Sequence, residues 1–327
     1  MRIIHKLLIG GILLTSFNAL ATLESWQGES KRQIMDFVSS AVDPSNELFV
    51  PVAERIAVFD NDGTLWAEQP MYFQAIYAID YIKKNAKDNP KWRDVPMIND
   101  ILNGTAKDKQ YDVKEILQMV MLSHGGMNTD QFSSQVGAWL ATAKHPKTGL
   151  KYNEMIYQPM VELLTYLREN DFKTYIVSGG GVEFMRVWAS DVYGIPPEQI
   201  IGSTVKTEYV VNGGKPQIMR KPEMDFLDDK AGKPVNINRI IGRKPVIAVG
   251  NSDGDREMLE WSTSGEGARL GILIHHTDSE REWAYDKDSH VGRLDQALNQ
   301  AKRENWLVVD MKNDWLSVFK AASGKTN

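Results

Sequence analysis

The feature that most constrains the fold of this 327-residue chain is a set of short apolar runs that each end at polar residues. Such runs cover residues 55–59 and 245–249, and a third expected strand, 173–177, begins with Lys173 and Thr174 and becomes apolar toward its end. They stop at Asp60, at Ser178 and, one glycine later, at Asn251. A short run with almost no polar residue is typical of a central strand in a parallel sheet, because helices cover both faces of such a sheet. We therefore expect three buried strands with polar side chains at their carboxyl ends.

Segments with helical spacing alternate with these runs. They are Ser30–Val42, Pro159–Asn170, Val182–Tyr193, Val235–Ile241 and Arg256–Trp261. Further strands are indicated at 200–204, 270–274 and 306–309, and a β-hairpin is indicated at 207–211 and 217–220. This alternation predicts an α/β fold with a Rossmann-like, doubly wound parallel sheet. Ligands bind such sheets beyond the carboxyl ends of the strands, where the strand order reverses.

The segment 66–157 has a different character. Helical spacing at 71–86, 113–122 and 129–142 is not accompanied by any clear strand alternation. We interpret the segment as a helical cap that is inserted into the core domain after the first strand. The core would then consist of residues 22–65 and 158–327, and the cap of residues 66–157.

The first 21 residues have the pattern of a signal peptide. Two basic residues, Arg2 and Lys6, precede an apolar run that is shorter than the roughly 20 residues of a membrane-spanning helix. Small residues follow in Ala19-Leu20-Ala21, which predicts cleavage before Thr22. We expect a periplasmic or extracellular protein without a membrane anchor after cleavage. Its formal side-chain charge would change from -5 to about -7.

Composition excludes several classes of function. The chain has no cysteine, which removes disulfides, a thiol nucleophile and cysteine-based zinc sites. The charge is modest and no basic stripe is present, so we expect no nucleic-acid partner. The oligomeric state does not follow from the sequence.

The pair Asp60 and Asp62 at the end of the first run favours phosphoryl chemistry. An aspartate can attack a phosphoryl group and hold it as an acyl-phosphate. A second carboxyl two residues later can protonate the leaving oxygen and then activate water. Gly63 allows a sharp turn, and Thr64 offers its hydroxyl and backbone N–H to phosphate oxygens. An acidic turn that only caps the next helix is the structural alternative.

Later strand ends complete a phosphate and metal site. Ser178 and the glycines from Gly179 onward offer a hydroxyl and backbone N–H groups to phosphate. A fixed cation is also needed, and Lys233 is the best candidate, with Lys230 close by. The acidic turn 251–255 contains Asn251, Asp253 and Asp255. Together with Asp60 and the backbone carbonyl of Asp62, one oxygen of this turn would bind Mg²⁺, which prefers oxygen ligands.

In this order the motifs resemble those of the haloacid dehalogenase superfamily, in its phosphoserine-phosphatase-like branch. The resemblance covers about residues 55–274 and implies a Rossmann-like core with a helical cap. It implies that Asp60 is the nucleophile and Asp62 the general acid and base. It also implies phosphate contacts from Ser178 and Lys233, and a metal motif at Asn251 and Asp255. The implied function is a Mg²⁺-dependent phosphatase for a small phosphorylated metabolite.

One residue departs from the family pattern, and two other functions stay open. The family usually has aspartate where this chain has Asn251, whose amide oxygen carries no formal charge, so that Asp253 or Asp255 could ligate the metal instead. The same nucleophile could serve a dehalogenase that acts on carbon, although that reaction needs neither Asp62 nor a metal. An exported binding protein without catalysis is the third possibility.

Several other residues have two readings. Trp66, Glu68, Tyr72 and Phe73 could shape the substrate pocket or pack in the core. Glu183 and Arg186 favour an ordinary ion pair. The loop 124–126 could face the site. The pair at 275–276 favours local hydrogen bonds at the sheet end rather than a zinc site.

Overall fold

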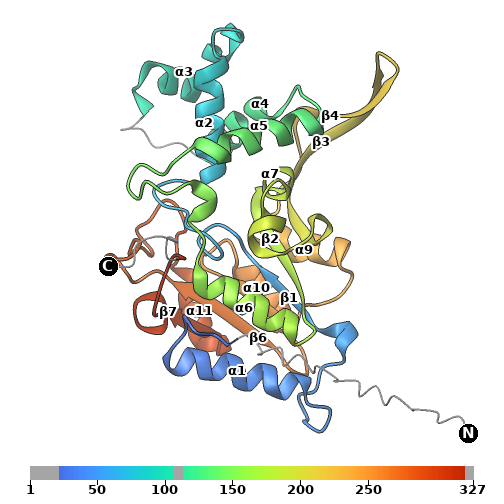
Figure 1. The fold of residues 1–327 in the computed structure, drawn as a ribbon, viewed down its shortest axis with the longest axis vertical. Helices are drawn as coiled ribbons and strands as arrows, with labels where there is room; N and C mark the ends of the chain where they lie inside the picture. The colour runs from blue at the N-terminus through green and yellow to red at the C-terminus, as the bar shows by residue number, and fades with distance from the viewer. Residues whose placement is uncertain (1–21, 107–112, 321–327) are drawn as a thin grey trace, which may run out of the picture.

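The computed structural model describes residues 22–106 and 113–320 (Figure 1). The predicted signal peptide, residues 1–21, lies outside this range. No helix in the two described ranges is both long and apolar enough to cross a membrane.

A seven-stranded sheet forms the centre of the molecule, with the strand order β4-β3-β2-β1-β5-β6-β7. Its strands are β1 (Ile56–Phe59), β2 (Lys173–Gly181), β3 (Ile200–Asn212), β4 (Lys215–Phe226), β5 (Ile247–Gly250), β6 (Leu270–His275) and β7 (Leu307–Asp310). All neighbouring strands are parallel except β3 and β4, which form an antiparallel hairpin. From β1 the chain proceeds to one side through β2 and β3 and later to the other through β5, β6 and β7. The strand order therefore reverses between β1 and β5, and the predicted α/β fold is confirmed.

Helices cover both faces of the sheet, which explains why its central strands are apolar throughout. The helices around the sheet are α1 (Gly28–Val42), α6 (Gln158–Glu169), α9 (Gly232–Ile240), α10 (Arg256–Thr263), α11 (Gln296–Glu304) and α12 (Met311–Asp314). Alternate side chains of β1 enter opposite cores. Ala57 and Phe59 join the core that contains α1 and α6, whereas Ile56 and Val58 join the one that contains α9, α10 and α11.

The described residues between β1 and α6 include four α-helices, which lie beside the carboxyl ends of the strands (Figure 1). They are α2 (Phe73–Asn85), α3 (Pro96–Asn103), α4 (Val113–His124) and α5 (Thr129–Thr142). Helices α2, α3 and α4 share a small apolar core of their own. The segments that lead into and out of this region pair with each other: Ala67 N donates to Met155 O at 2.9 Å, and Tyr157 N donates to Leu65 O at 3.0 Å. The three helices predicted in this segment are present as α2, α4 and α5, whereas α3 was not predicted.

Two elements of the core differ from the prediction. Strand β2 continues beyond Ser178 to Gly181, because Gly181 still pairs with Ser203 of β3. The helix predicted at 182–193 is two short helices, α7 (Val182–Arg186) and α8 (Ala189–Tyr193). Between them, the buried ring of Trp188 stacks on the ring of Trp66 at 4.1 Å, and this packing interrupts the helix.

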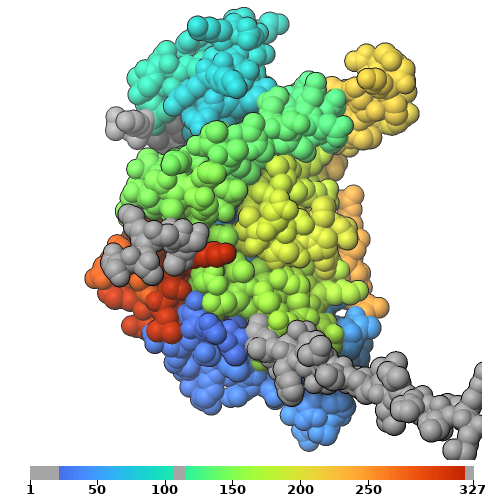
Figure 2. Space-filling view, in the orientation of Figure 1, coloured from blue at the N-terminus to red at the C-terminus, as the bar shows by residue number. Residues whose placement is uncertain are grey.

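The hairpin of β3 and β4 is longer than the prediction. Its paired register runs from Thr204 with Phe226 to Asn212 with Lys215. The tip stands clear of the rest of the molecule (Figure 2). The middle of the hairpin lies beside the cap, since Asn128, at the start of α5, forms a bridge with Met219.

Candidate active site

A cavity of about 420 Å³ lies at the carboxyl edge of the sheet, where the strand order reverses. It is lined by the predicted catalytic residues Asp60, Asp62, Ser178 and Lys233, by the predicted phosphate contact Gly179 and by the predicted metal residue Asp255. Helix α4 contributes an apolar wall of Ile116, Leu117, Val120 and Met121. The structure therefore brings side chains from β1, β2, α9 and the turn after β5 together beneath the cap.

Lys233 is the electrostatic centre of this set of residues. Its Nζ lies 2.6 Å from Asp60 Oδ1 and 2.5 Å from Asp255 Oδ1, and it donates to Val177 O at 3.0 Å. Burial opposes the charged form of the ammonium, but Asp255 and Asp60 outweigh burial and raise the pKa of Lys233 above its ordinary value. The alternative cation, Lys230, is exposed. The geometry thus favours Lys233 over Lys230 as the cation beside the nucleophile.

Asp60 is buried, and one of its two carboxylate oxygens contacts Lys233. The residue is 6% exposed, and burial together with the Asp255 carboxyl raises the pKa of Asp60 well above its usual range, although Lys233 opposes this shift. Its backbone N donates to Val249 O at 2.9 Å, which anchors it to β5. Because Lys233 contacts Oδ1, the other carboxylate oxygen can face a substrate in the cavity.

Asp62 has the properties of a general acid. Burial raises the pKa of its carboxyl to about 6, and a hydrogen bond from Trp66 Nε1 to Asp62 Oδ1 at 2.8 Å opposes the shift. A carboxylic acid with a raised pKa keeps its proton closer to neutral pH, as a proton donor requires. Trp66 is itself buried in the core, so its indole N–H holds the Asp62 carboxylate in a fixed position.

Ser178 and Gly179 lie on the cavity floor at the carboxyl end of β2. Ser178 is 1% exposed, and its Oγ accepts a hydrogen bond from Gly180 N at 3.1 Å. The hydroxyl proton of Ser178 can therefore be donated to a phosphate oxygen.

Thr64 differs from the prediction. Its side chain is fully buried, and Oγ1 donates to Asn251 Oδ1 at 3.1 Å instead of facing the cavity. The turn after Asp60 directs this hydroxyl toward the chain beyond β5, because Thr64 N and Leu65 N both donate to Asn61 O. Thr64 orients the amide of Asn251 and is not placed to contact phosphate.

The acidic turn after β5 divides its carboxylates between different tasks. Asp253 Oδ1 accepts from Asp295 N at 3.1 Å and Ala297 N at 2.8 Å, at the start of α11. Asp255 Oδ2 accepts from Asn251 N and Ser252 N, both at 3.0 Å. Asp253 thus binds the backbone at the start of α11, whereas Asp255 binds the backbone of its own turn and Lys233.

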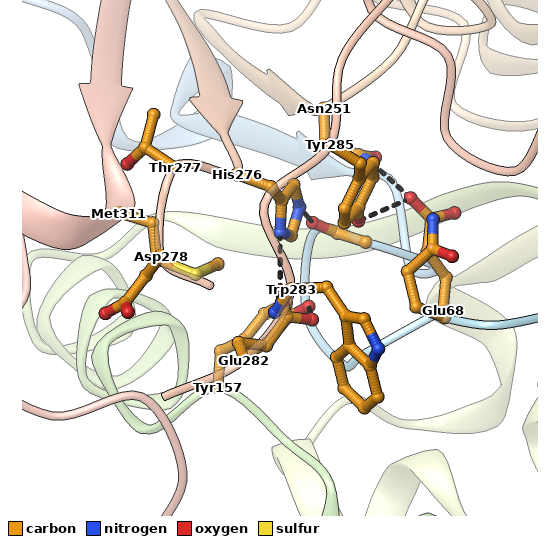
Figure 3. A network of polar contacts seen from close by, with 12 residues as sticks. Glu68, Tyr157, Asn251, His276, Thr277, Asp278, Glu282, Trp283, Tyr285 and Met311 are labelled. Atoms are coloured by element: carbon orange, nitrogen blue, oxygen red, sulfur yellow. Dashed lines mark hydrogen bonds and ion pairs between the residues drawn. The ribbon is translucent and has the colours of Figure 1, made fainter. Parts of the chain in front are cut away.

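Glu68 and His276 make more contacts at the site than the sequence pattern indicated. Glu68 is 1% exposed, lines the cavity and accepts hydrogen bonds from Asn251 and Tyr285 (Figure 3). Burial and the charges of Asp62 and Asp60 raise the pKa of Glu68 well above its usual range, although the hydrogen bonds from Tyr285 and Asn251 oppose the shift. His276, interpreted from sequence as a local hydrogen-bonding residue, contacts Gly63 O through Nε2 at 2.8 Å. The signal for Glu68 was a carboxylate in an otherwise apolar stretch directly after the nucleophile turn.

Two polar contacts across the cavity had no sequence signal. Gln74 Oε1 accepts from Gly181 N at 2.7 Å, and Gln74 Nε2 lies 3.1 Å from His124 Nε2. Burial lowers the pKa of His124 well below its usual range, so the imidazole is neutral. His124 does line the cavity, as one reading of the loop 124–126 suggested.

Glu183 does not pair with Arg186. It lies 2.7 Å from the buried Arg220 of β4, whose guanidinium also covers the ring of Phe132 at 3.7 Å. Arg186 donates instead to Pro197 O at 3.0 Å. The pairing of Glu183 with a residue 37 positions away depends on the hairpin and could not be read from local spacing.

The residues at the floor fit a divalent cation. No cluster of three or more His, Cys, Asp and Glu side chains in residues 22–106 and 113–320 is arranged as a metal site. However, a magnesium site that uses backbone and amide oxygens does not need such a cluster. Four carboxyl groups (Asp60, Asp62, Glu68 and Asp255) line this end of the cavity, and Lys233 pairs with only two of them. This excess of negative charge favours a bound cation.

The parallel sheet, the strand-end aspartates and the cavity at the point of strand reversal define a hydrolase of the α/β class. The sequence profile of the haloacid dehalogenase-like hydrolases matches residues 57–260. The chain belongs to this family, as its motifs indicated. No curated protein sequence matches the chain significantly.

Two solved structures show the similarity of fold. A protein of unknown function from Anaerococcus prevotii superposes with a TM-score of 0.57 at 18% identity, covering 88% of this chain and 93% of that chain. A protein of unknown function from Bordetella pertussis superposes with a TM-score of 0.50 at 11% identity, covering 79% and 99% of the two chains. At such low identity these similarities concern the fold and not the activity.

Proposed function

We propose that this hydrolase is an exported, Mg²⁺-dependent phosphatase that acts on a small phosphorylated metabolite. The observation that supports this most is the position of Asp60. Its carboxylate lies at the point of strand reversal, contacts Lys233 and opens onto a cavity that also holds Asp62 and Ser178. A cavity of about 420 Å³ suits a small organic phosphate.

In the first step, the free oxygen of Asp60 attacks phosphorus and the bond to the ester oxygen breaks. Asp62 gives its proton to that oxygen, so the alcohol leaves as a neutral molecule. The Ser178 hydroxyl and the N–H of Gly179 hold phosphoryl oxygens, while Lys233 stabilises their charge. Asp60 is left as an aspartyl-phosphate.

In the second step, the carboxylate of Asp62 takes a proton from a water molecule, whose oxygen attacks phosphorus. The bond between phosphorus and Asp60 breaks, which releases phosphate and restores both carboxyl groups. Asp60, the backbone carbonyl of Asp62 and Asn251 would hold Mg²⁺, which supplies charge stabilisation for the phosphoryl oxygens.

Asp62 also separates this proposal from a dehalogenase. Displacement of a halide from carbon needs no proton donor, whereas departure of an alkoxide does. A carboxyl whose pKa is raised to about 6 beside the nucleophile favours the phosphatase.

The function is tested by phosphate release from a panel of phosphorylated amino acids, amino alcohols, sugars and nucleotides, with Mg²⁺ and with EDTA. We expect release from at least one compound with Mg²⁺, and a loss of about a thousandfold or more in Asp60→Asn. Acid quenching with a labelled substrate should leave the label on Asp60. Absence of phosphate release across the panel would contradict the proposal, and chelator-insensitive halide release would favour the dehalogenase.

Export is supported by the basic residues, the short apolar run and the small residues before Thr22. Fractionation of a bacterium that expresses the full chain, followed by N-terminal sequencing, tests this part separately. A mature protein that starts at Thr22 outside the cytoplasm is expected, and an uncleaved cytoplasmic protein would contradict export.

A further inference from the structure

Glu68 is held directly beside the amide that occupies the position of a metal ligand. Its Oε1 accepts hydrogen bonds from Asn251 Nδ2 and Tyr285 OH, both at 2.8 Å (Figure 3). Both bonds end on the same oxygen. Among the described residues, the hydrogen bonds to Glu68 reach only Oε1 and not Oε2, and Glu68 lines the cavity together with Asp60 and Asp62. One carboxylate oxygen is therefore fixed, and the other is available to a cation.

Two glycines form the slot that contains this carboxylate. A Cβ atom on Gly63 would lie 2.3 Å from Glu68 Oε1 and 2.1 Å from Asn251 Nδ2. A Cβ atom on Gly292 would lie 1.8 Å from Glu68 Oε1. Both glycines have positive φ angles, +72° and +65°. Positions 63 and 292 therefore have no room for a side chain, because the Glu68 carboxylate fills the space beside both glycines.

A second layer of aromatic and imidazole groups holds the slot in position. The ring of His276 stacks on that of Tyr285 at 4.3 Å, and its Nε2 contacts Gly63 O (Figure 3). On its other side, His276 Nδ1 lies 3.2 Å from Glu282 Oε2, and Tyr157 OH donates to Glu282 Oε1 at 2.7 Å. The same imidazole therefore positions the nucleophile turn and the tyrosine that binds Glu68.

Glu68 and Asn251 are chemically complementary. The hydroxyl of Thr64 donates to Asn251 Oδ1, so the Nδ2 group faces Glu68 and donates to it. An aspartate at 251 would place two carboxylates in direct contact without a proton between them. The contact is satisfied when one partner is an amide and the other carries the charge.

We propose that Glu68 supplies the negative charge that Asn251 lacks in the divalent cation site formed with Asp60 and the carbonyl of Asp62. This inference rests on the proposed Mg²⁺-dependent phosphatase and adds a metal-site residue to it. Asn251 and Glu68 act together. The negative charge is carried by Glu68, on the segment that enters the cap, instead of by residue 251 in the turn after β5.

The test is Mg²⁺ binding by isothermal titration calorimetry to the substrate-free full-length protein. Glu68→Gln keeps the shape of the side chain and removes its charge, and should weaken Mg²⁺ binding by about 10- to 100-fold. In the double variant Glu68→Gln/Asn251→Asp, the amide of residue 68 can donate to the carboxylate of residue 251. The charge has then only changed places, and the affinity should return to within about threefold of the wild type.

Glu183→Gln is the matched control, because Glu183 lines the same cavity but pairs with Arg220. It should leave the Mg²⁺ affinity unchanged. An unchanged affinity in Glu68→Gln would overturn the inference, as would a loss that the double variant does not restore. If the wild type binds no Mg²⁺ yet releases phosphate, this inference fails while the phosphatase proposal survives. Conversely, Mg²⁺ binding that depends on Glu68 without any phosphate release would support the site and contradict the activity.

Discussion

Lys233 is buried at 2% exposure, and its ammonium contacts two carboxylates at once. A buried ammonium is unfavourable unless its surroundings replace the water that it has lost. Asp60 and Asp255 provide that replacement, together with Val177 O. The same contacts fix the Asp60 carboxylate, the proposed nucleophile, and hold the acidic turn against it.

Replacement of Lys233 by methionine should therefore destabilise the fold as well as abolish catalysis. The two carboxyls would remain buried without their counterion, which costs about 3–5 kcal/mol in comparable cases. Urea unfolding in EDTA measures this loss. Lys230→Met, at an exposed position three residues earlier, is the control and should change the free energy of unfolding by less than about 0.5 kcal/mol. Equal effects of the two substitutions would contradict the role of Lys233.

Asp228 should make stability depend on pH. Its side chain is fully buried, and burial raises the pKa of Asp228 to about 7, although Lys233 opposes the shift. An unfolded aspartate loses its proton near pH 3.9, so between about pH 4 and 7 the folded state binds more protons. Stability contributed by this group is complete below about pH 4 and declines as pH rises to about 7.

Asp228→Asn cannot titrate and should lack this decline. Between pH 4 and 7.5, we expect the wild type to lose about 2–4 kcal/mol more than the variant. Urea titrations at several pH values measure the difference. Parallel stability profiles would show that Asp228 ionises normally in the folded protein.

At the scale of elements, the hairpin of β3 and β4 connects the core to the cap. Gly126 N donates to Arg220 O at 2.9 Å, and Arg220 N donates to Met127 O at 3.0 Å. The Arg220 side chain adds the ion pair with Glu183 and the contact with the ring of Phe132. A strand of the core thus pairs with the loop before α5, which holds the cap over the cavity.

Arg220→Met should loosen this attachment. It leaves the mostly buried Glu183 carboxylate without its partner, which should lower the free energy of unfolding by about 3 kcal/mol. Limited proteolysis should also cut the cap faster. Lys206→Met is the control, because Lys206 forms an exposed pair with Glu223 on the same hairpin, and such pairs contribute at most about 1 kcal/mol. An unchanged rate of proteolysis in Arg220→Met would contradict the role of Arg220 in attaching the cap to the core.

At the scale of the whole molecule, α5 and the start of α2 belong to the main core, whereas α3, α4 and the rest of α2 share a small separate one. Local opening is easiest where a small apolar cluster can separate without disrupting the main core. We expect amides of α3 and α4 to exchange with deuterium faster than those of β1 and β5. Hydrogen exchange read by mass spectrometry measures this, and equal protection in both parts would indicate one cooperative unit.

Much of the core followed from local sequence patterns. The strands β1 and β5 are apolar at every position because both of their faces are buried, and this leaves a signal within four residues. The helix at Thr129–Thr142 has the limits that its helical spacing predicted, and in the structure Asn128 forms a capping box with Gln131 at its start. By contrast, the split between α7 and α8 depends on the stacking of Trp188 on Trp66, which are 122 positions apart.

The sequence by itself determined the α/β fold and the placement of Asp60, Asp62, Ser178 and Lys233 at one cavity, because parallel strands carry their carboxyl ends to the same edge. Only the tertiary structure decided what each oxygen contacts. It turned Thr64 away from the cavity and Asp253 toward α11, and it placed Glu68 against Asn251. These contacts join segments that are far apart in the chain, so no local pattern encodes them. The order of the motifs along the chain thus indicates phosphoryl chemistry. Packing between distant segments decides which charged side chains lie next to Asp60 and Asn251.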